Sequence, residues 1–270
     1  MHSWLEVDVR YVCFNKVLKI KNLGEGKKMF QFTMISIAAA AITGSALAGP
    51  ILSIKFDVDG NKSSMLQEGT LTPFNDYSYA GSVGDGFPNA TWIVGWDLAS
   101  NFSSTSFVTN GFTIGNLSPT TKRFNITLDI PNTLPSGGGG TPSWEFFGNL
   151  GGTLTSNTGA ASTLSSYETN PLWQGLRGGT SPGVNSELLR NFTFTTPGAT
   201  STAIPLVQIT PYTVVGGLGT SLGYQFQFDL SGGSTASFSG IWGGNLVPAP
   251  SALALVGLSG VNLLRRRRCM

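Results

Sequence analysis

Histidine and cysteine, the side chains that most often carry nucleophilic and metal chemistry, occur only near the two ends of this 270-residue chain. The single histidine is His2, and the two cysteines are Cys13 and Cys269. Residues 49–247 therefore contain no Ser-His-Asp arrangement, no cysteine nucleophile, no thiolate or imidazole for a metal ion, and no disulfide. We expect no catalytic centre of these kinds in this region.

Carboxylates are the groups left for catalysis, because a pair of them can hydrolyse a glycosidic bond without histidine. Glu145, Glu168 and Glu187 are the candidates, but nothing in their spacing pairs them. The sequence therefore favours a noncatalytic protein and leaves a secreted enzyme that acts on glycosides as an alternative. Two carboxylates facing each other across an open cleft, about 5–10 Å apart, would favour the enzyme.

Four oxygen-bearing side chains recur at the spacing of a calcium loop, at its positions one, three, five and twelve. They are Asp57, Asp59, Asn61 and Glu68. Lys62, however, stands at the sixth position, where such a loop requires glycine. The alternative is a strand that ends in a turn at Asp59-Gly60. Ca²⁺ is the only cofactor that the sequence suggests.

The chain ends in an apolar segment followed by four arginines. Val247, Pro248, Ala249 and Pro250 precede an apolar run over residues 251–264, and Arg265, Arg266, Arg267 and Arg268 follow it. Prolines are tolerated in the first turn of a helix, because the N–H groups there have no intrahelical partner. The 18 residues of 247–264 are just long enough to cross a hydrocarbon core of about 30 Å at about 1.5 Å per residue. We expect a short transmembrane helix with its arginines on the cytoplasmic side.

This arrangement of prolines, apolar helix and arginine cluster resembles the PEP-CTERM sorting signal of exported bacterial proteins. The resemblance covers about the last tenth of the chain, and Ala249 stands where glutamate is usual in that family. In that family a membrane transpeptidase, the exosortase, recognises and cuts the tail, and the protein body goes to the cell surface or the extracellular matrix. The resemblance implies an inner-membrane precursor whose partners are the exosortase and the general secretion machinery. The resemblance indicates where the protein is delivered and implies no biochemical activity.

The N-terminal part has the three regions of a secretory signal peptide. Lys27 and Lys28 precede an apolar run at 35–42, and Ala46 and Ala48 form a small-residue cleavage site. Cleavage after Ala48 gives a leader of 20 residues if the chain starts at Met29, which falls within the usual range of about 15–30. The expected parts are an over-extended start at 1–28, a signal helix at 29–48, a folded domain at 49–246 and the sorting segment at 247–270.

The formal charge of +2 comes from the two ends of the chain. Six of the sixteen Lys and Arg residues lie before Met29 and four are the terminal arginines, so residues 49–247 hold six basic and eleven acidic side chains. A body with a net charge near −5 lacks the basic surface that binds phosphate backbones. We therefore expect no nucleic-acid partner.

Between residues 49 and 247 the chain has the pattern of an antiparallel β protein. Val, Ile, Phe, Thr, Tyr and Trp collect in short runs that Gly, Asn, Ser and Pro separate. The predicted strands are 51–58, 90–98, 106–114, 124–130, 144–150, 189–195, 203–209, 222–230 and 236–242. We expect 106–114 and 124–130 to form a hairpin, and 172–176 and 185–189 each to form a single helical turn.

These strands predict an all-β fold, an antiparallel β-sandwich with jelly-roll or immunoglobulin-like connections. The domain is long enough to bury one sizeable core. Trp92 and Trp96 share one face of a strand and are expected in that core, whereas Trp173 lies in a loop-like segment and is the tryptophan that we expect to be exposed.

The expected function is that of a noncatalytic cell-surface or matrix protein that an exosortase processes and that associates with exopolysaccharide. A carbohydrate-binding module and the glycoside-acting enzyme are the alternatives.

Overall fold

The computed structural model describes residues 49–86, 89–103, 105–132 and 142–247, together with two short strands nearer the N-terminus. These two strands, β1 (Val7–Asp8) and β2 (Lys19–Ile20), pair antiparallel. They belong to one compact unit, Met1–Ala46, and all other described residues belong to a second unit, Leu47–Met270.

The predicted leader at 29–48 and residues 248–270 of the predicted tail lie outside the described part of the chain. The predicted cleavage and sorting residues among them are Ala46, Ala48, Pro248, Pro250, Arg265, Arg266, Arg267 and Arg268. Val247 is described, and it is the last residue of a strand in which it lies opposite Ser143.

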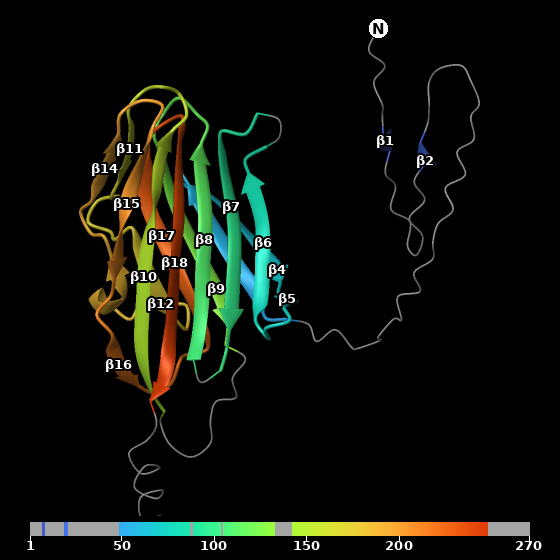
Figure 1. Ribbon diagram of the computed structural model, residues 1–270, viewed down its shortest axis with the longest axis vertical. Helices are drawn as coiled ribbons and strands as arrows, with labels where there is room; N and C mark the ends of the chain where they lie inside the picture. The colour runs from blue at the N-terminus through green and yellow to red at the C-terminus, as the bar shows by residue number, and fades with distance from the viewer. Residues whose placement is uncertain are drawn as a thin grey trace, which may run out of the picture. The chain divides into compact units, whose positions relative to one another are not determined.

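Two eight-stranded antiparallel sheets form the second unit (Figure 1). The strands of the first, sheet I, are β5 (Thr70–Leu71), β6 (Tyr77–Gly84), β7 (Trp92–Asn101), β8 (Thr105–Asn116), β10 (Ser143–Ser156), β15 (Ser201–Gln208), β16 (Tyr212–Val215) and β18 (Ser234–Val247). Their order across the sheet is β15-β10-β18-β8-β7-β6-β5, and β16 also pairs with β10.

The strands of the second, sheet II, are β3 (Ile51–Val58), β4 (Asn61–Glu68), β9 (Lys122–Pro131), β11 (Ser162–Ser165), β12 (Trp173–Arg177), β13 (Glu187–Leu188), β14 (Thr193–Thr196) and β17 (Ser221–Leu230). Their order is β13-β12-β17-β9-β3-β4, with β11 beside β17 and β14 beside β11. The 3₁₀ turn η1 (Val184–Ser186) precedes β13. Across the described ranges, no helix has the length and hydropathy needed to cross a membrane.

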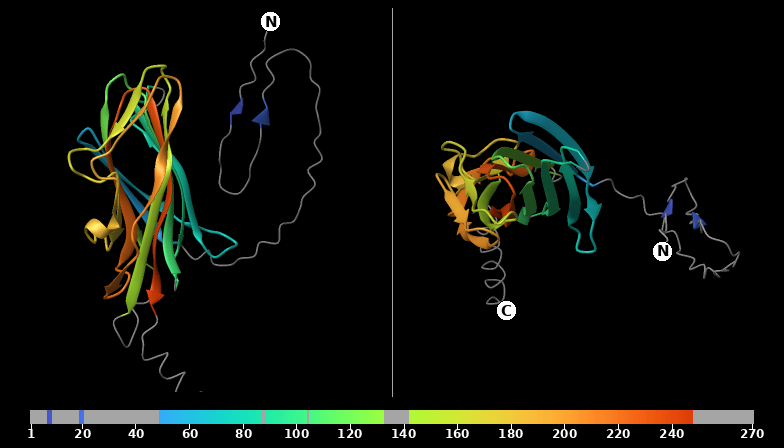
Figure 2. Two further views of the ribbon diagram at one scale, coloured as in Figure 1. Left: turned by 60° about the vertical axis from the view of Figure 1, so that its left-hand side comes forward. Right: turned by 90° about the horizontal axis from the view of Figure 1, so that it is seen from above.

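The core lies between the two sheets because each strand buries alternate side chains. In β17, Tyr224, Phe226 and Phe228 are fully buried, as the aromatic/polar alternation of this strand predicts. The ring of Phe226 lies 5.0 Å from that of Phe238, on β18 of sheet I. Two antiparallel sheets that share this aromatic core are consistent with the predicted β-sandwich, and Figure 2 gives two further views of them.

The predicted hairpin of 106–114 with 124–130 is wrong, because β8 and β9 belong to different sheets. The chain crosses between the sheets after β8, where the buried Asn116 holds the connection. Its Nδ2 donates to the carbonyl oxygens of Thr120 and Leu230, both at 2.8 Å, and its Oδ1 accepts from the Ser118 hydroxyl at 2.7 Å. Each strand pairs instead with one distant in sequence, β8 with β18 and β9 with β17.

Trp173, predicted to be exposed, is fully buried, and residues 172–176 form most of β12 and no helical turn. Pairing of β12 with β17 sets Trp173 opposite Phe226, and its ring lies 5.9 Å from that of Trp242. The prediction failed because this strand is short and follows Asn-Pro, which is typical of a loop. Trp92 and Trp96 are buried, as predicted.

Candidate functional site

The outer face of sheet II carries polar side chains on its central strands. On β17, Gln225 and Gln227 alternate with the buried aromatic residues, so their side chains point away from the core. On β9, Asn125 and Thr127 alternate in the same way with Phe124, Ile126 and Leu128. Because β12 pairs with β17, Gln174 lies opposite Gln225 on the same face.

Three of these side chains form a continuous row of hydrogen bonds, which we call the amide ladder. Gln174 Nε2 donates to Gln225 Oε1 at 2.7 Å, and Gln225 Nε2 donates to Asn125 Oδ1 at 2.7 Å. The ladder crosses β12, β17 and β9, which at the usual spacing of about 4.8 Å per strand makes it roughly 10 Å long. At its ends, Gln174 Oε1 and Asn125 Nδ2 bond to no other described residue, so an acceptor and a donor are left for a ligand.

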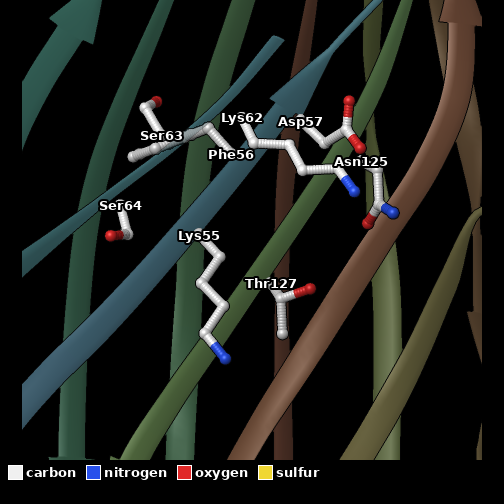
Figure 3. Close-up of a pocket in the computed structure, with 8 residues that line it drawn as sticks. All are labelled: Lys55, Phe56, Asp57, Lys62, Ser63, Ser64, Asn125 and Thr127. Carbon is white, nitrogen blue, oxygen red and sulfur yellow. The ribbon is translucent and has the colours of Figure 1, made fainter. Parts of the chain in front are cut away.

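The ladder leads into a depression of about 420 Å³ over β9, β3 and β4 (Figure 3). The strand register brings its side chains together: Asn125 lies opposite Asp57, Asp57 opposite Lys62, and Thr127 opposite Lys55. The residues that line it are Lys55, Phe56, Asp57, Lys62, Ser63, Ser64, Asn125 and Thr127. Amide, hydroxyl and ammonium groups dominate this surface, which suits a hydrated polar ligand.

Asp129 lies on the outer face of sheet II, two residues beyond Thr127 on β9. Its Oδ1 is buried and has no hydrogen-bond partner among the described residues. Burial raises the pKa of this carboxyl above its ordinary value, against the opposing effects of a hydrogen bond from Ser221 and the charge of Lys55. Folding therefore disfavours the ionised form of Asp129.

The structure brings three of the four calcium candidates to one turn and leaves the fourth apart. β3 and β4 are joined by Asp59 and Gly60, which both have positive φ angles, +52° and +84°, so this is a two-residue turn of the kind that favours Asp-Gly. Asp57 Oδ1 accepts from the Gly60 N–H at 3.0 Å, next to Asn61. Glu68 lies at the far end of β4, seven residues and roughly 23 Å from Asn61 at about 3.3 Å per residue.

The oxygens of Asp59 already have protein partners. Oδ1 accepts from the Arg123 backbone N–H at 2.8 Å, and Oδ2 forms an ion pair with Lys122 Nζ at 3.1 Å. In the described ranges, no group of three or more His, Cys, Asp or Glu side chains is placed to hold a metal ion. The turn at Asp59-Gly60, the alternative interpretation of these residues, is present.

The three candidate catalytic glutamates lie on separate elements. Glu145 is on β10 of sheet I, Glu187 is on β13 of sheet II, and Glu168 lies between β11 and β12. Glu187 is paired with Arg190, whose Nε lies 2.6 Å from Glu187 Oε2. None of the three lines the depression.

Sequence reasoning did not identify the ladder or the depression. The alternation in residues 224–230 does indicate that Gln225 faces outward. Its partners, however, are 51 and 100 residues away along the chain, and no local pattern marks Gln174 or Asn125 as neighbours.

Comparison with known proteins places this chain in no family. No family model matches it, and neither the curated proteins nor the solved structures include a significant match.

Proposed function

We propose that this chain is an exported, noncatalytic protein that binds polysaccharide of the cell envelope or extracellular matrix through the outer face of sheet II. The observation that carries the proposal is the amide ladder. A sugar hydroxyl is both a donor and an acceptor, and an amide held in place by its neighbours offers both groups in fixed positions. The ladder thus presents a fixed acceptor, Gln174 Oε1, and a fixed donor, Asn125 Nδ2, next to a polar depression, an arrangement that suits a chain of hydroxyl-bearing units.

Export is supported by the two ends of the sequence. The leader at 29–48 and the tail at 247–270, which resembles the PEP-CTERM sorting signal, together indicate secretion and processing by an exosortase. The proposed course is a precursor held in the inner membrane by the apolar tail, followed by release of the body to the cell surface or beyond. In a host that lacks the exosortase, we expect a membrane-bound precursor that keeps its arginines. Equal secretion of the protein with and without the exosortase would contradict this proposed export and processing.

We also infer that the sandwich has jelly-roll connections. The chain changes sheets seven times among the described strands, at the β4–β5, β8–β9, β9–β10, β10–β11, β14–β15, β16–β17 and β17–β18 connections. This alternation sets β8, β18, β10 and β15 side by side in one sheet and β9, β17, β12 and β13 in the other, as two interleaved Greek keys do. Lectin domains are among the proteins with this architecture, a likeness of fold that by itself assigns no function.

Binding is tested with the purified full chain and a panel of soluble polysaccharides, by affinity electrophoresis and calorimetry. Gln225→Ala removes the central member of the ladder and both of its hydrogen bonds, so we expect about a tenfold loss of affinity, which corresponds to about 1.4 kcal/mol. Asn149→Ala is the matched control, since it removes an outward-facing amide from β10 of sheet I. Unchanged affinity in Gln225→Ala, or no binding to any polysaccharide, would refute the proposal.

A further inference from the structure

The basic residues of the body are segregated on one side of the fold. All six Lys and Arg residues of 49–247 lie on strands of sheet II or between them: Lys55, Lys62, Lys122, Arg123, Arg177 and Arg190. The strands of sheet I contain none, although they contain Asp97 and Glu145. Seven of the eleven acidic residues of 49–247 also lie on or between strands of sheet II, so its side carries a net charge near −1 and the side of sheet I one near −4. The cations of the body thus lie on its less negative side, together with the amide ladder.

Four of these six cationic side chains have interaction partners within the protein. Lys122 pairs with Asp59 at 3.1 Å, and Arg123 Nε pairs with Asp229 at 3.2 Å. Arg190 pairs with Glu187. Arg177 lies against the core, with its guanidinium carbon 5.9 Å from the centre of the Phe146 ring. Each of these four side chains already has a carboxylate or an aromatic ring as a partner within the protein.

Lys55 and Lys62 are the two that remain. Both are exposed, and neither lies within 4.0 Å of a carboxylate oxygen among the described residues. Both line the depression at the end of the ladder, where Figure 3 shows them with Asn125 and Thr127.

Two carboxylates lie near these lysines. Asp57, which lies opposite Lys62, accepts the Gly60 N–H in the turn. Asp129 acts on Lys55 electrostatically, but one of its oxygens is buried and its pKa is raised, and it does not line the depression. Two ammonium groups and the single carboxylate of Asp57 therefore line the depression, a net charge of +1, beside amide and hydroxyl groups.

We infer that the polysaccharide is an anionic one, with acidic groups on its sugar units that Lys55 and Lys62 bind while its hydroxyls contact the amide ladder. This inference rests on the proposed function. An acidic group is the chemistry that two exposed ammonium groups recognise, and elsewhere the negatively charged body repels a polyanion. The ligand is thus directed to this one face.

The test measures binding of the full chain to polygalacturonate, dextran sulfate and uncharged dextran at low and high salt. We expect both acidic polymers to bind more tightly than dextran, and this preference to decrease at high salt because exposed ion pairs are screened. Lys55→Gln and Lys62→Gln should each lower affinity for polygalacturonate about threefold, and the double variant about tenfold. Lys122→Gln is the matched control: it removes the same charge from a residue that does not line the depression, and it should change affinity less than twofold.

The outcomes separate the inference from the proposed function. Equal binding of dextran and polygalacturonate, with both lysine variants unchanged, overturns the inference, whereas the effect of Gln225→Ala would still support polysaccharide binding. Loss of affinity in Lys122→Gln as large as in Lys62→Gln also overturns it, because net charge alone would then explain the preference. Tighter binding of both acidic polymers than of dextran, with loss of affinity in both lysine variants, supports the inference.

Discussion

Replacement of Asn116 by alanine should destabilise the whole fold, because this side chain holds the connection between the two sheets. The side chain is fully buried and makes four hydrogen bonds. Two of its partners keep another bond in the variant: the Ser118 N–H still donates to Thr91 O at 3.1 Å, and Thr120 O still accepts from the Ser118 hydroxyl at 2.9 Å. The bond to Thr120 O also keeps the Ser118 hydroxyl paired, so the Leu230 carbonyl is the partner that loses its side-chain bond. That loss, together with the cavity left by the buried side chain, costs about 2–4 kcal/mol.

The assay is urea and thermal unfolding of the full chain, followed by tryptophan fluorescence. For a domain of this size, about 2–4 kcal/mol corresponds to a decrease in Tm of about 5–15 °C. Asn61→Ala is the matched control, because Asn61 is exposed at the start of β4 and its side chain bonds to no described residue; it should change stability by less than about 0.5 kcal/mol. If the free energies of unfolding of Asn116→Ala and Asn61→Ala differ by less than about 1 kcal/mol, the Asn116 side chain does not stabilise the β8–β9 connection and the prediction is refuted.

Three further predictions concern the same body. Asp129→Asn should raise Tm at pH 7 and have little effect at pH 3. Burial raises the folded-state pKa of Asp129, so the contribution of this carboxyl to stability is lost as the pH rises from its ordinary pKa through the raised one. An equal gain in Tm at both pH values would contradict this. Gly175→Ala should cost about 1–3 kcal/mol in urea unfolding, since a Cβ there would lie 2.5 Å from ring carbons of Trp242, whereas Gly95→Ala, whose Cβ would have no neighbour closer than 3.8 Å, serves as its control. Calorimetric titration with Ca²⁺ should give no heat and no rise in Tm, because Glu68 is held at the opposite end of β4 from the turn; a stoichiometric heat would show that the turn binds calcium without it.

The strands predicted with the most accurate bounds are two in which apolar and polar side chains alternate. β3 has the predicted bounds, 51–58, and β17 begins one residue before the predicted 222 and ends at the predicted 230. One of the strands that were not predicted, β4, has the sequence NKSSMLQE, with no apolar alternation. It lies at the edge of sheet II and pairs only with β3, so backbone hydrogen bonds and the turn at Asp59-Gly60 hold it there rather than burial of its side chains.

The sequence of residues 49–247 by itself predicted the all-β class of the fold, and it excluded chemistry that depends on histidine or cysteine side chains in this region. The alternation of apolar and polar side chains along a strand is a local property of the sequence, and the lack of histidine and cysteine is a property of its composition. Neither depends on how the strands assemble. The tertiary structure decided which strands are neighbours, and with that it buried Trp173, separated β8 from β9, and brought Gln174, Gln225 and Asn125 into one row. Neighbour and register follow from the packing of side chains far apart in sequence, such as Phe226 against Phe238 across the two sheets, and a local pattern holds no information about such contacts.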